Sequence, residues 1–248
     1  MLTDSAAQAT DLPFDGHLAQ LNLPELRREF IAQGEFIALA EFMPRGTLEP
    51  LLAALPQIEP RIHRNFIPGY KKGGSVSRFD LDQGAPAFGA LYHDPAFVEF
   101  LRALTAQPLR YCPAKDPHTY ALYYYTEAGD HIGFHYDMSY YKGARYTVLL
   151  GLVDESSARL EYELFRDDAS RASVTGSIAL QPGMLVVFNG DRVYHRVTPC
   201  AAGERRVALT LEYLTSLEMH PVRRFVSNMK DAIAYFGFRQ VFGRTVGR

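Results

Sequence analysis

The feature that most constrains the fold is a succession of short β-prone segments in the second half of the chain. From about residue 117 onward, runs rich in Tyr, Val, Leu and Thr are divided by Gly, Asp, Ser and Pro. Eight such runs follow one another, at residues 118–127, 131–137, 145–154, 158–165, 173–181, 184–190, 193–198 and 205–215. Successive strands of this kind are typical of a sandwich or jelly roll, whereas βα units would place a helix pattern between strands. The sequence therefore predicts a double-sheet β core.

Helical patterns flank this predicted core on both sides. The clearest covers residues 93–108, where Asp94 can cap the first turn and Pro95 suits the next position. Similar signals predict helices over residues 23–34, 48–55 and 222–236, and residues 35–43 read as a strand. The segments 63–92 and 138–145 show no readable period, and we expect them to be loops that shape a pocket.

Together these segments predict a mostly β protein with flanking helices (α+β), folded as a single domain over residues 1–248. Hydrophobic residues make up 47% of the chain and aromatic residues 12%, which is enough for one sizeable core. We expect residues 1–20 to be loose, 21–116 to hold N-terminal helices and a strand, 117–215 to form the β core and 216–248 to form a C-terminal helix. That last helix is expected to cover the core, and a role as a lid or in a homodimer remains open.

Composition argues against several kinds of partner and compartment. The formal net charge is −2 without a long basic run, so bulk charge predicts neither a nucleic-acid nor a membrane partner. Cys112 and Cys200 lie far apart and form no CxxC pattern, which fits a reducing environment better than a disulfide framework or a zinc site. No signal-peptide pattern and no run of about 18 apolar residues is present. We therefore expect a soluble, cytoplasmic protein.

The segment "GDHIGFHYDMSYYKG" contains a pair of potential metal ligands. Residues two apart in a strand point to the same face, so His135 and Asp137 can reach one cavity together. His195, in a later predicted strand, is the best candidate for a third ligand. Two histidines and one carboxylate on one face suit a non-haem Fe(II) that keeps three positions open. The alternative is that His-x-Asp arises here by chance, as a short pattern often does.

A buried cation is the second requirement of such a site if the cosubstrate is 2-oxoglutarate, because its distal carboxylate needs a partner. "RRVALTLEYLT" supplies Arg205 and Arg206 beyond His195. Arg206 shares a strand face with the small or polar residues Ala208, Thr210 and Glu212, as a pocket wall would. Arg206 is therefore the predicted carboxylate partner, and Arg205 is expected to point to solvent.

These motifs together resemble the Fe(II)/2-oxoglutarate-dependent dioxygenases. The matched pattern is His135-x-Asp137, then "QPGMLVVFNGDRVYHRVTP" up to His195, then Arg206 at the start of the last strand. The resemblance covers about residues 117–215 and implies a double-stranded β-helix (jelly roll, cupin-like) core. It also implies that His135, Asp137 and His195 hold the catalytic Fe(II) and that Arg206 binds 2-oxoglutarate. Tyr125, ten residues before His135, stands where prolyl-hydroxylase-like members often place a cosubstrate-contacting tyrosine; otherwise it is an ordinary strand residue.

Within that superfamily, the sequences of three segments are similar to those of small enzymes that hydroxylate or halogenate free amino acids such as lysine. The segments are "YKKGGSVSRFDL", "GDHIGFHYDMSYYKGARYTVLLGLVD" and "RRFVSNMKDAIAYFGFRQVFG". In the halogenases Gly or Ala replaces the ligand carboxylate, so the presence of Asp137 implies hydroxylation. The chain has no Trp, which the lysine halogenases are expected to use in the pocket, so another amino acid or small polar molecule is as good a candidate.

The sequence thus predicts an enzyme that oxidises a small substrate with O₂ and 2-oxoglutarate. Three further residues are candidates for substrate contact, namely Arg78, His118 and His131, although each could equally be a surface or turn residue. The alternatives are the same chemistry on a protein or peptide side chain, another oxidative outcome such as desaturation or cyclisation, and a cupin-like metal-binding module without oxygenase activity. Substrate identity, position and stereochemistry are not encoded in these spacings.

Overall fold

The structure is a computed structural model that describes residues 14–117, 119–138 and 141–218. All eight strands expected in the second half are present. They are β5 (Tyr120–Tyr125), β6 (His131–His135), β7 (Arg145–Glu155), β8 (Leu160–Leu164), β9 (Val174–Ile178), β10 (Leu185–Asn189), β11 (Tyr194–Val197) and β12 (Arg205–Leu214). Four more come from the first half: β1 (Phe36–Leu39), β2 (His63–Ile67), β3 (Lys71–Ser77) and β4 (Arg110–Tyr111).

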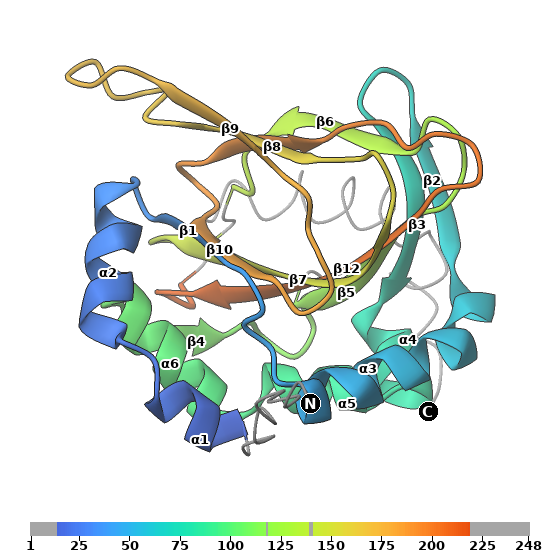
Figure 1. Ribbon diagram of the computed structural model, residues 1–248, viewed down its shortest axis with the longest axis horizontal. Coiled ribbons are helices and arrows are strands. Elements are labelled where there is room, and N and C mark those ends of the chain that lie inside the picture. The colour runs from blue at the N-terminus through green and yellow to red at the C-terminus, as the bar shows by residue number, and fades with distance from the viewer. Residues whose placement is uncertain (1–13, 118, 139–140, 219–248) are drawn as a thin grey trace, which may run out of the picture.

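The strands form one antiparallel sheet that folds over on itself. Its order is β1-β10-β7-β12-β5-β3-β6-β11-β8-β9, with β2 paired to β3 and β4 paired to β12. In Figure 1 the strands β1, β10, β7, β12 and β5 form one layer, and β6, β8 and β9 lie across from it as the second layer. The strand β3 pairs with both β5 and β6 and so joins the two layers. This confirms the double-sheet jelly roll expected from the sequence.

Helices cover the outer face of the larger layer (Figure 1). Val207, Leu209 and Leu211 of β12 are buried in one cluster with Phe30 and Leu101 from the helices. The opposite face of the same strand carries Arg206, Thr210 and Glu212, as expected from period two. The helices are α1 (Phe14–Ala19), α2 (Leu23–Ala32), α3 (Arg45–Ile58), the 3₁₀ helix η1 (Glu59–Arg61), α4 (Arg78–Gly84), α5 (Ala87–Tyr92) and α6 (Pro95–Thr105).

Helix α6 begins as its sequence predicts. The Asp94 carboxylate accepts a hydrogen bond of 2.8 Å from the backbone N–H of Phe97. Loss of an N-cap acceptor typically costs about 1 kcal/mol. We expect Asp94→Ala to lower the free energy of unfolding by about that amount in urea titrations. On the same helix, Glu99→Ala removes an exposed ion pair with Arg102 and should cost about 0.5 kcal/mol or less; equal losses in the two variants would contradict the cap.

The first half of the chain differs from expectation in two places. Residues 14–19, expected to be loose, form α1, and residues 63–92, expected to be loops, form β2, β3, α4 and α5. The segment "KKGGSVS" lacks polar–apolar alternation because almost all of β3 is buried between its neighbours. A Cβ atom on Gly74 would lie 2.6 Å from Ile62 Cγ2, so this close packing requires glycine. The region 21–116 therefore contributes strands to the sheet itself.

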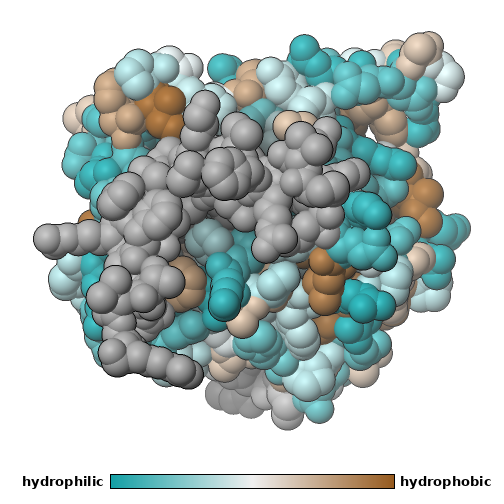
Figure 2. All heavy atoms as spheres, turned by 180° about the vertical axis from the view of Figure 1, so that it is seen from behind, coloured by the Kyte–Doolittle hydropathy of each residue, from teal (hydrophilic) through white to brown (hydrophobic). Residues whose placement is uncertain are grey.

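The surface and the two ends of the chain also bear on the expectations from the sequence. Figure 2 shows that on the described surface seen from behind, apolar residues lie in small patches among hydrophilic ones. Among the described helices, none combines the length and the apolar character that crossing a membrane requires. The expected C-terminal helix and most of the segment 1–20 lie outside the described residues.

Candidate metal centre

The structure brings together His135, Asp137 and His195, the three residues expected to bind a metal. His135 ends β6 and stands directly opposite His195 of β11, with 4.3 Å between the ring centroids. Asp137 follows the end of β6, and its Oδ1 lies 3.3 Å from Nε2 of His135. Its Oδ2 lies 3.6 Å from Nε2 of His195. One ligand atom from each residue lies within 4.8 Å of the others, a spacing that one metal ion can bridge.

The backbone orients both imidazole rings toward this point. Nδ1 of His135 lies 2.8 Å from the carbonyl oxygen of Gly133, and Nδ1 of His195 lies 3.0 Å from that of Val193. When Nδ1 carries the proton and donates it to the carbonyl, the lone pair of Nε2 is left for a metal. Both histidines therefore present the same nitrogen to the centre.

The electrostatic environment favours the ligand forms of Asp137 and His195. Burial alone would raise the pKa of Asp137, but His195, His135 and Arg145 together hold this pKa well below its usual range. Burial, reinforced by the nearby His135, lowers the pKa of His195 to about 4. For His135, burial lowers the pKa, but the hydrogen bond and charge of Asp137 outweigh it and raise the pKa overall. At neutral pH, Asp137 is thus ionised and His195 is neutral, as metal binding requires.

Two neighbours fix the position of the Asp137 carboxylate. Thr147 in β7 donates a hydrogen bond of 2.8 Å from Oγ1 to Oδ2 of Asp137. Gly190 packs against the same residue, and a Cβ atom at this glycine would lie 2.7 Å from the Asp137 carbonyl oxygen. The Asn-Gly step after β10 therefore lets the segment beyond β6 approach closely enough to place Asp137 between the histidines.

We expect Thr147→Val to weaken metal binding by roughly 10- to 100-fold, the usual effect of removing a group that orients a ligand. The substitution preserves shape and deletes the hydroxyl that holds Asp137. Titration of the apoprotein with Co(II), followed by its visible absorption, measures the affinity. Thr210→Val is the matched control, because Thr210 lines the same cavity from β12; an equal loss in the control would show that the Thr147 hydrogen bond has no special role.

The three residues open onto a cavity of about 320 Å³, lined by residues from strands of both layers. Apolar and aromatic side chains form much of its wall, including Ile67, Tyr70, Tyr123, Ile132 and Met138. The cavity also holds a charged pair, since Nε of Arg145 donates a 2.7 Å hydrogen bond to Oε2 of Glu212. Such a mainly apolar wall with a few polar groups is typical of a small-molecule site.

Arg206 lies beside Tyr125, which lines the cavity. The two residues are directly opposite in the β12–β5 pair, and the guanidinium carbon lies 5.4 Å from the Tyr125 ring centroid. Arg206 is only 1% exposed, yet its Nε and Nη1 have no hydrogen-bond partner among the described residues. Burial lowers the pKa of Arg206, opposed by the nearby Tyr125, and burial also raises the pKa of Tyr125 to about 12. Arg206 is therefore a buried cation next to a residue of the cavity wall, and two of its nitrogens make no hydrogen bond within the described part of the chain.

Arg205 points to the other side of β12, as expected from alternation. Its guanidinium pairs with Glu59, and its side chain is 39% exposed, so it lies at the edge of the solvent. The structure thus separates the two neighbouring arginines into a buried one beside the cavity and a paired one outside it.

Of the three candidates for substrate contact, the two that the structure describes lie outside the cavity lining. Arg78, at the start of α4, pairs with Asp82 at 3.4 Å and donates to Thr119 outside the cavity lining. By strict alternation His131 would share the face of His135, but β6 carries a bulge: the two-residue step from His195 to Val197 on β11 spans three residues on β6. This bulge turns Ile132 into the cavity, while Nδ1 of His131 lies 2.8 Å from the Gly129 carbonyl. His118 lies outside the described residues.

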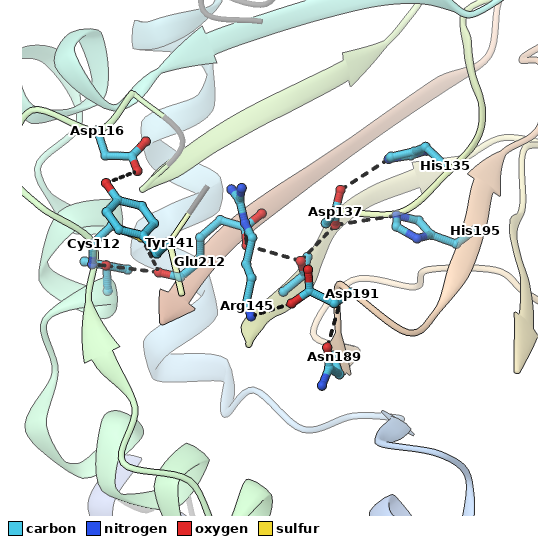
Figure 3. A network of polar contacts seen from close by, with 12 residues as sticks. Cys112, Asp116, His135, Asp137, Tyr141, Arg145, Asn189, Asp191, His195 and Glu212 are labelled. Carbon is cyan, nitrogen blue, oxygen red and sulfur yellow. Dashed lines mark hydrogen bonds and ion pairs between the residues drawn. The ribbon is translucent and has the colours of Figure 1, made fainter. Parts of the chain in front are cut away.

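Several residues of the site were missed from the sequence, or, in the case of Glu212, placed on the pocket wall without a role. Arg145, Thr147 and Glu212 are joined to Asp137 by hydrogen bonds (Figure 3). Lys71 of β3 is 1% exposed, with Nζ 4.8 Å from the Tyr123 ring centroid, and burial lowers its pKa well below the usual range. The sequence shows these residues only as polar positions within otherwise apolar strands. That pattern does not reveal which strands pair with one another, so it does not bring the residues together.

Comparison with known proteins adds a fold to this geometry. No protein-family model and no curated protein matches the chain. Among solved structures, the non-heme alpha ketoglutarate dependent epimerase SnoN from nogalamycin biosynthesis is 16% identical with a TM-score of 0.63, over 77% of this chain and 82% of that chain. A prolyl hydroxylase from Trichoplax adhaerens is 15% identical with a TM-score of 0.63, over 81% and 91%. A Pseudomonas putida prolyl-4-hydroxylase is 17% identical with a TM-score of 0.57, over 78% and 98%.

These neighbours establish the fold of the chain. Its folded-over antiparallel sheet is similar to the jelly-roll core of solved 2-oxoglutarate/Fe(II) oxygenases, which confirms the fold class expected from the sequence. The neighbours span an epimerase, a carbocyclase and prolyl hydroxylases, so this fold hosts several oxidative outcomes. The activity of this chain must therefore be argued from its own residues.

Proposed function

We propose that the protein is an Fe(II)- and 2-oxoglutarate-dependent oxygenase that hydroxylates a small substrate, a free amino acid or a derivative of one. The observation that carries the proposal is the pairing of two features in one cavity region. The ligand atoms of His135, Asp137 and His195 converge there. Next to Tyr125 of the cavity wall, the buried Arg206 has two nitrogens without a partner among the described residues. A metal module without a keto-acid cosubstrate would account for the first feature only.

The residues present fit both groups. Two imidazole nitrogens and one carboxylate on one side of a centre are the donor set of non-haem Fe(II) sites that leave positions open for other ligands. A buried guanidinium with unused donors is an unfavourable arrangement unless an anion reaches it, and a carboxylate matches its planar fork. Arg206 and Tyr125 would thus hold the distal carboxylate of 2-oxoglutarate, while His135, Asp137 and His195 would hold iron.

When bound, iron with 2-oxoglutarate and O₂ supplies the oxidation, in which a substrate C–H becomes C–OH and the cosubstrate becomes succinate and CO₂. The chain supplies orientation and a dry site. Its cavity wall of Ile67, Tyr70, Ile132 and Leu149 would shield the reacting atoms from water once cosubstrate and substrate fill the cavity. Asp137 occupies the carboxylate position of the ligand set, which favours hydroxylation over chemistry that needs a vacant position there.

The volume of the cavity supports a small substrate. A volume of about 320 Å³ lies at the lower end of the usual range for ligand sites and must also take the cosubstrate. The prolyl hydroxylase from Trichoplax adhaerens is in complex with a peptide fragment, so the same chemistry on a peptide side chain is the second candidate. The buried free thiols of Cys112 and Cys200 are compatible with a reducing compartment such as the cytoplasm.

An anaerobic titration of the purified protein with Fe(II) and then 2-oxoglutarate tests the proposal. We expect the visible charge-transfer band of an iron-chelated keto acid, and we expect it to be absent in His135→Ala. Admission of O₂ should then release succinate, faster in the presence of the right substrate. Metal binding without the band would reject the oxygenase and favour the cupin-like metal-binding module.

A further inference from the structure

The Arg145–Glu212 pair is the second charged feature of the cavity, distinct from Arg206. Arg145 begins β7 and Glu212 lies near the end of β12, where the two strands are neighbours. Both side chains are largely buried, 11% and 7% exposed, and both residues line the cavity. Figure 3 shows the pair on one side of Asp137, with the two histidines on the other.

The pair is held rigidly by its surroundings. The backbone N–H of Arg145 donates to the Asp191 carboxylate at 3.0 Å, and its carbonyl accepts from Gly190. The backbone carbonyl of Glu212 accepts from the Tyr92 hydroxyl at 3.1 Å. Thr147 Oγ1 lies 3.2 Å from Glu212 Oε2 and 2.8 Å from Asp137 Oδ2, so the pair is two hydrogen bonds from the proposed metal ligand.

Arg145 keeps donor nitrogens, and Glu212 keeps an acceptor oxygen, that make no hydrogen bond to any described residue. Arg145 uses Nε for Glu212, and no described residue accepts a hydrogen bond from its Nη1 or Nη2. Glu212 accepts from Nε of Arg145 and lies close to Oγ1 of Thr147 through the same oxygen, Oε2, and in the described part of the chain no hydrogen bond reaches Oε1. Because Nε and Oε2 are only 2.7 Å apart, the free donors and the free acceptor are adjacent at the cavity wall.

We propose that Arg145 and Glu212 form the recognition site for the head group of a free α-amino acid, with the carboxylate on Arg145 and the ammonium on Glu212. A guanidinium fork binds a carboxylate through paired hydrogen bonds, and a carboxylate oxygen accepts from an ammonium. An α-amino acid carries both groups on one carbon, at the close spacing that the pair offers. A side chain within a peptide carries no such head group, so the pair selects the free molecule.

This inference rests on the proposed function and assigns the two arginines different ligands. Arg206 lies beside Tyr125 and binds the cosubstrate, whereas Arg145 lies on the Glu212 side and binds the substrate. A purely structural ion pair would be costly to bury, and a cavity position with unused donors adds to that cost. Both charges are used when a zwitterion binds there.

The test uses the wild-type protein loaded anaerobically with Fe(II) and 2-oxoglutarate, whose charge-transfer band reports both the cosubstrate and a nearby substrate. The probes are the common L-amino acids, their methyl esters and their N-acetyl derivatives. We expect at least one amino acid to perturb the band saturably, and we expect its ester and its N-acetyl derivative to bind roughly 10- to 100-fold more weakly. This comparison needs no substitution and does not depend on turnover.

Two variants then separate the roles of the pair. Arg145→Met should keep the band but lose the response to the amino acid, with little difference left between acid and ester. Glu212→Gln should keep the preference for the acid over the ester and lose the preference for the free amine over its N-acetyl derivative. Arg205→Met, which alters the pair with Glu59 outside the cavity, is the matched control and should behave as wild type.

The outcomes distinguish this inference from the proposed function. If the wild-type band forms but no free amino acid perturbs it, or if acid and ester bind equally, the recognition site is wrong and the oxygenase stands. An unchanged amino-acid response in Arg145→Met or in Glu212→Gln would also overturn it. Absence of the band in the wild-type protein would overturn the proposed function and this inference with it.

Discussion

Replacing Asp137 by alanine is expected to abolish substrate-dependent succinate release and to weaken Fe(II) binding by at least on the order of 100-fold. Asp137 supplies the only carboxylate of the ligand group, and both of its oxygens face a histidine Nε2 atom. Its loss leaves two imidazoles and removes the charge that favours a divalent cation in a buried site. Metal affinity is measured by anaerobic titration of the apoprotein, and turnover by succinate formed per protein.

The control for this substitution is Asp167→Ala. Asp167 is an exposed carboxylate that accepts a hydrogen bond from the Tyr136 hydroxyl, one residue before Asp137. Its removal disturbs the same segment without removing a ligand, so we expect metal affinity close to wild type. Wild-type turnover in Asp137→Ala would reject the assigned ligand group, whereas equal losses in both variants would indicate a general disturbance of the segment after β6.

Much of the site could be predicted because strands impose a strict alternation. Period two placed Arg206 on the cavity side of β12 and Arg205 on the other side, and the structure agrees. The eight segments of the second half were readable because turn residues separate short apolar runs. His135 and His195 were identified separately, and the structure makes them direct partners across β6 and β11.

The rest could not be predicted because it depends on pairing and on local irregularity. The bulge in β6 changes which residues face the cavity, so Ile132 lines it and His131 does not. The Arg145–Glu212 pair arises only because β7 and β12 are neighbours, which the order of segments along the chain does not reveal. The strand β3 is buried and rich in glycine, so it carries none of the alternation by which a half-exposed strand is recognised.

Replacing Arg206 by methionine is expected to raise the dissociation constant for 2-oxoglutarate by roughly 10- to 100-fold, because a hydrogen bond to a charged group contributes about 1.5–3 kcal/mol. Iron binding should change little, since Arg206 is outside the ligand group. The measurement is a titration of 2-oxoglutarate into the Fe(II)-loaded protein without O₂. Arg205→Met is the control, and an unchanged cosubstrate affinity in Arg206→Met would transfer the role to another buried cation such as Lys71.

A second readout of the same variant separates a ligand-binding role from a structural one. Arg206 is buried with two nitrogens that no described residue satisfies, so in the absence of cosubstrate it costs free energy. Methionine has a similar length and no charge, and we expect the apoprotein variant to be as stable as wild type or more stable in urea unfolding. Added 2-oxoglutarate with metal should stabilise the wild type and not the variant, because only a ligand that binds the native state raises its stability. A destabilised apoprotein would instead show that Arg206 holds the fold together, and the cosubstrate site would have to lie elsewhere.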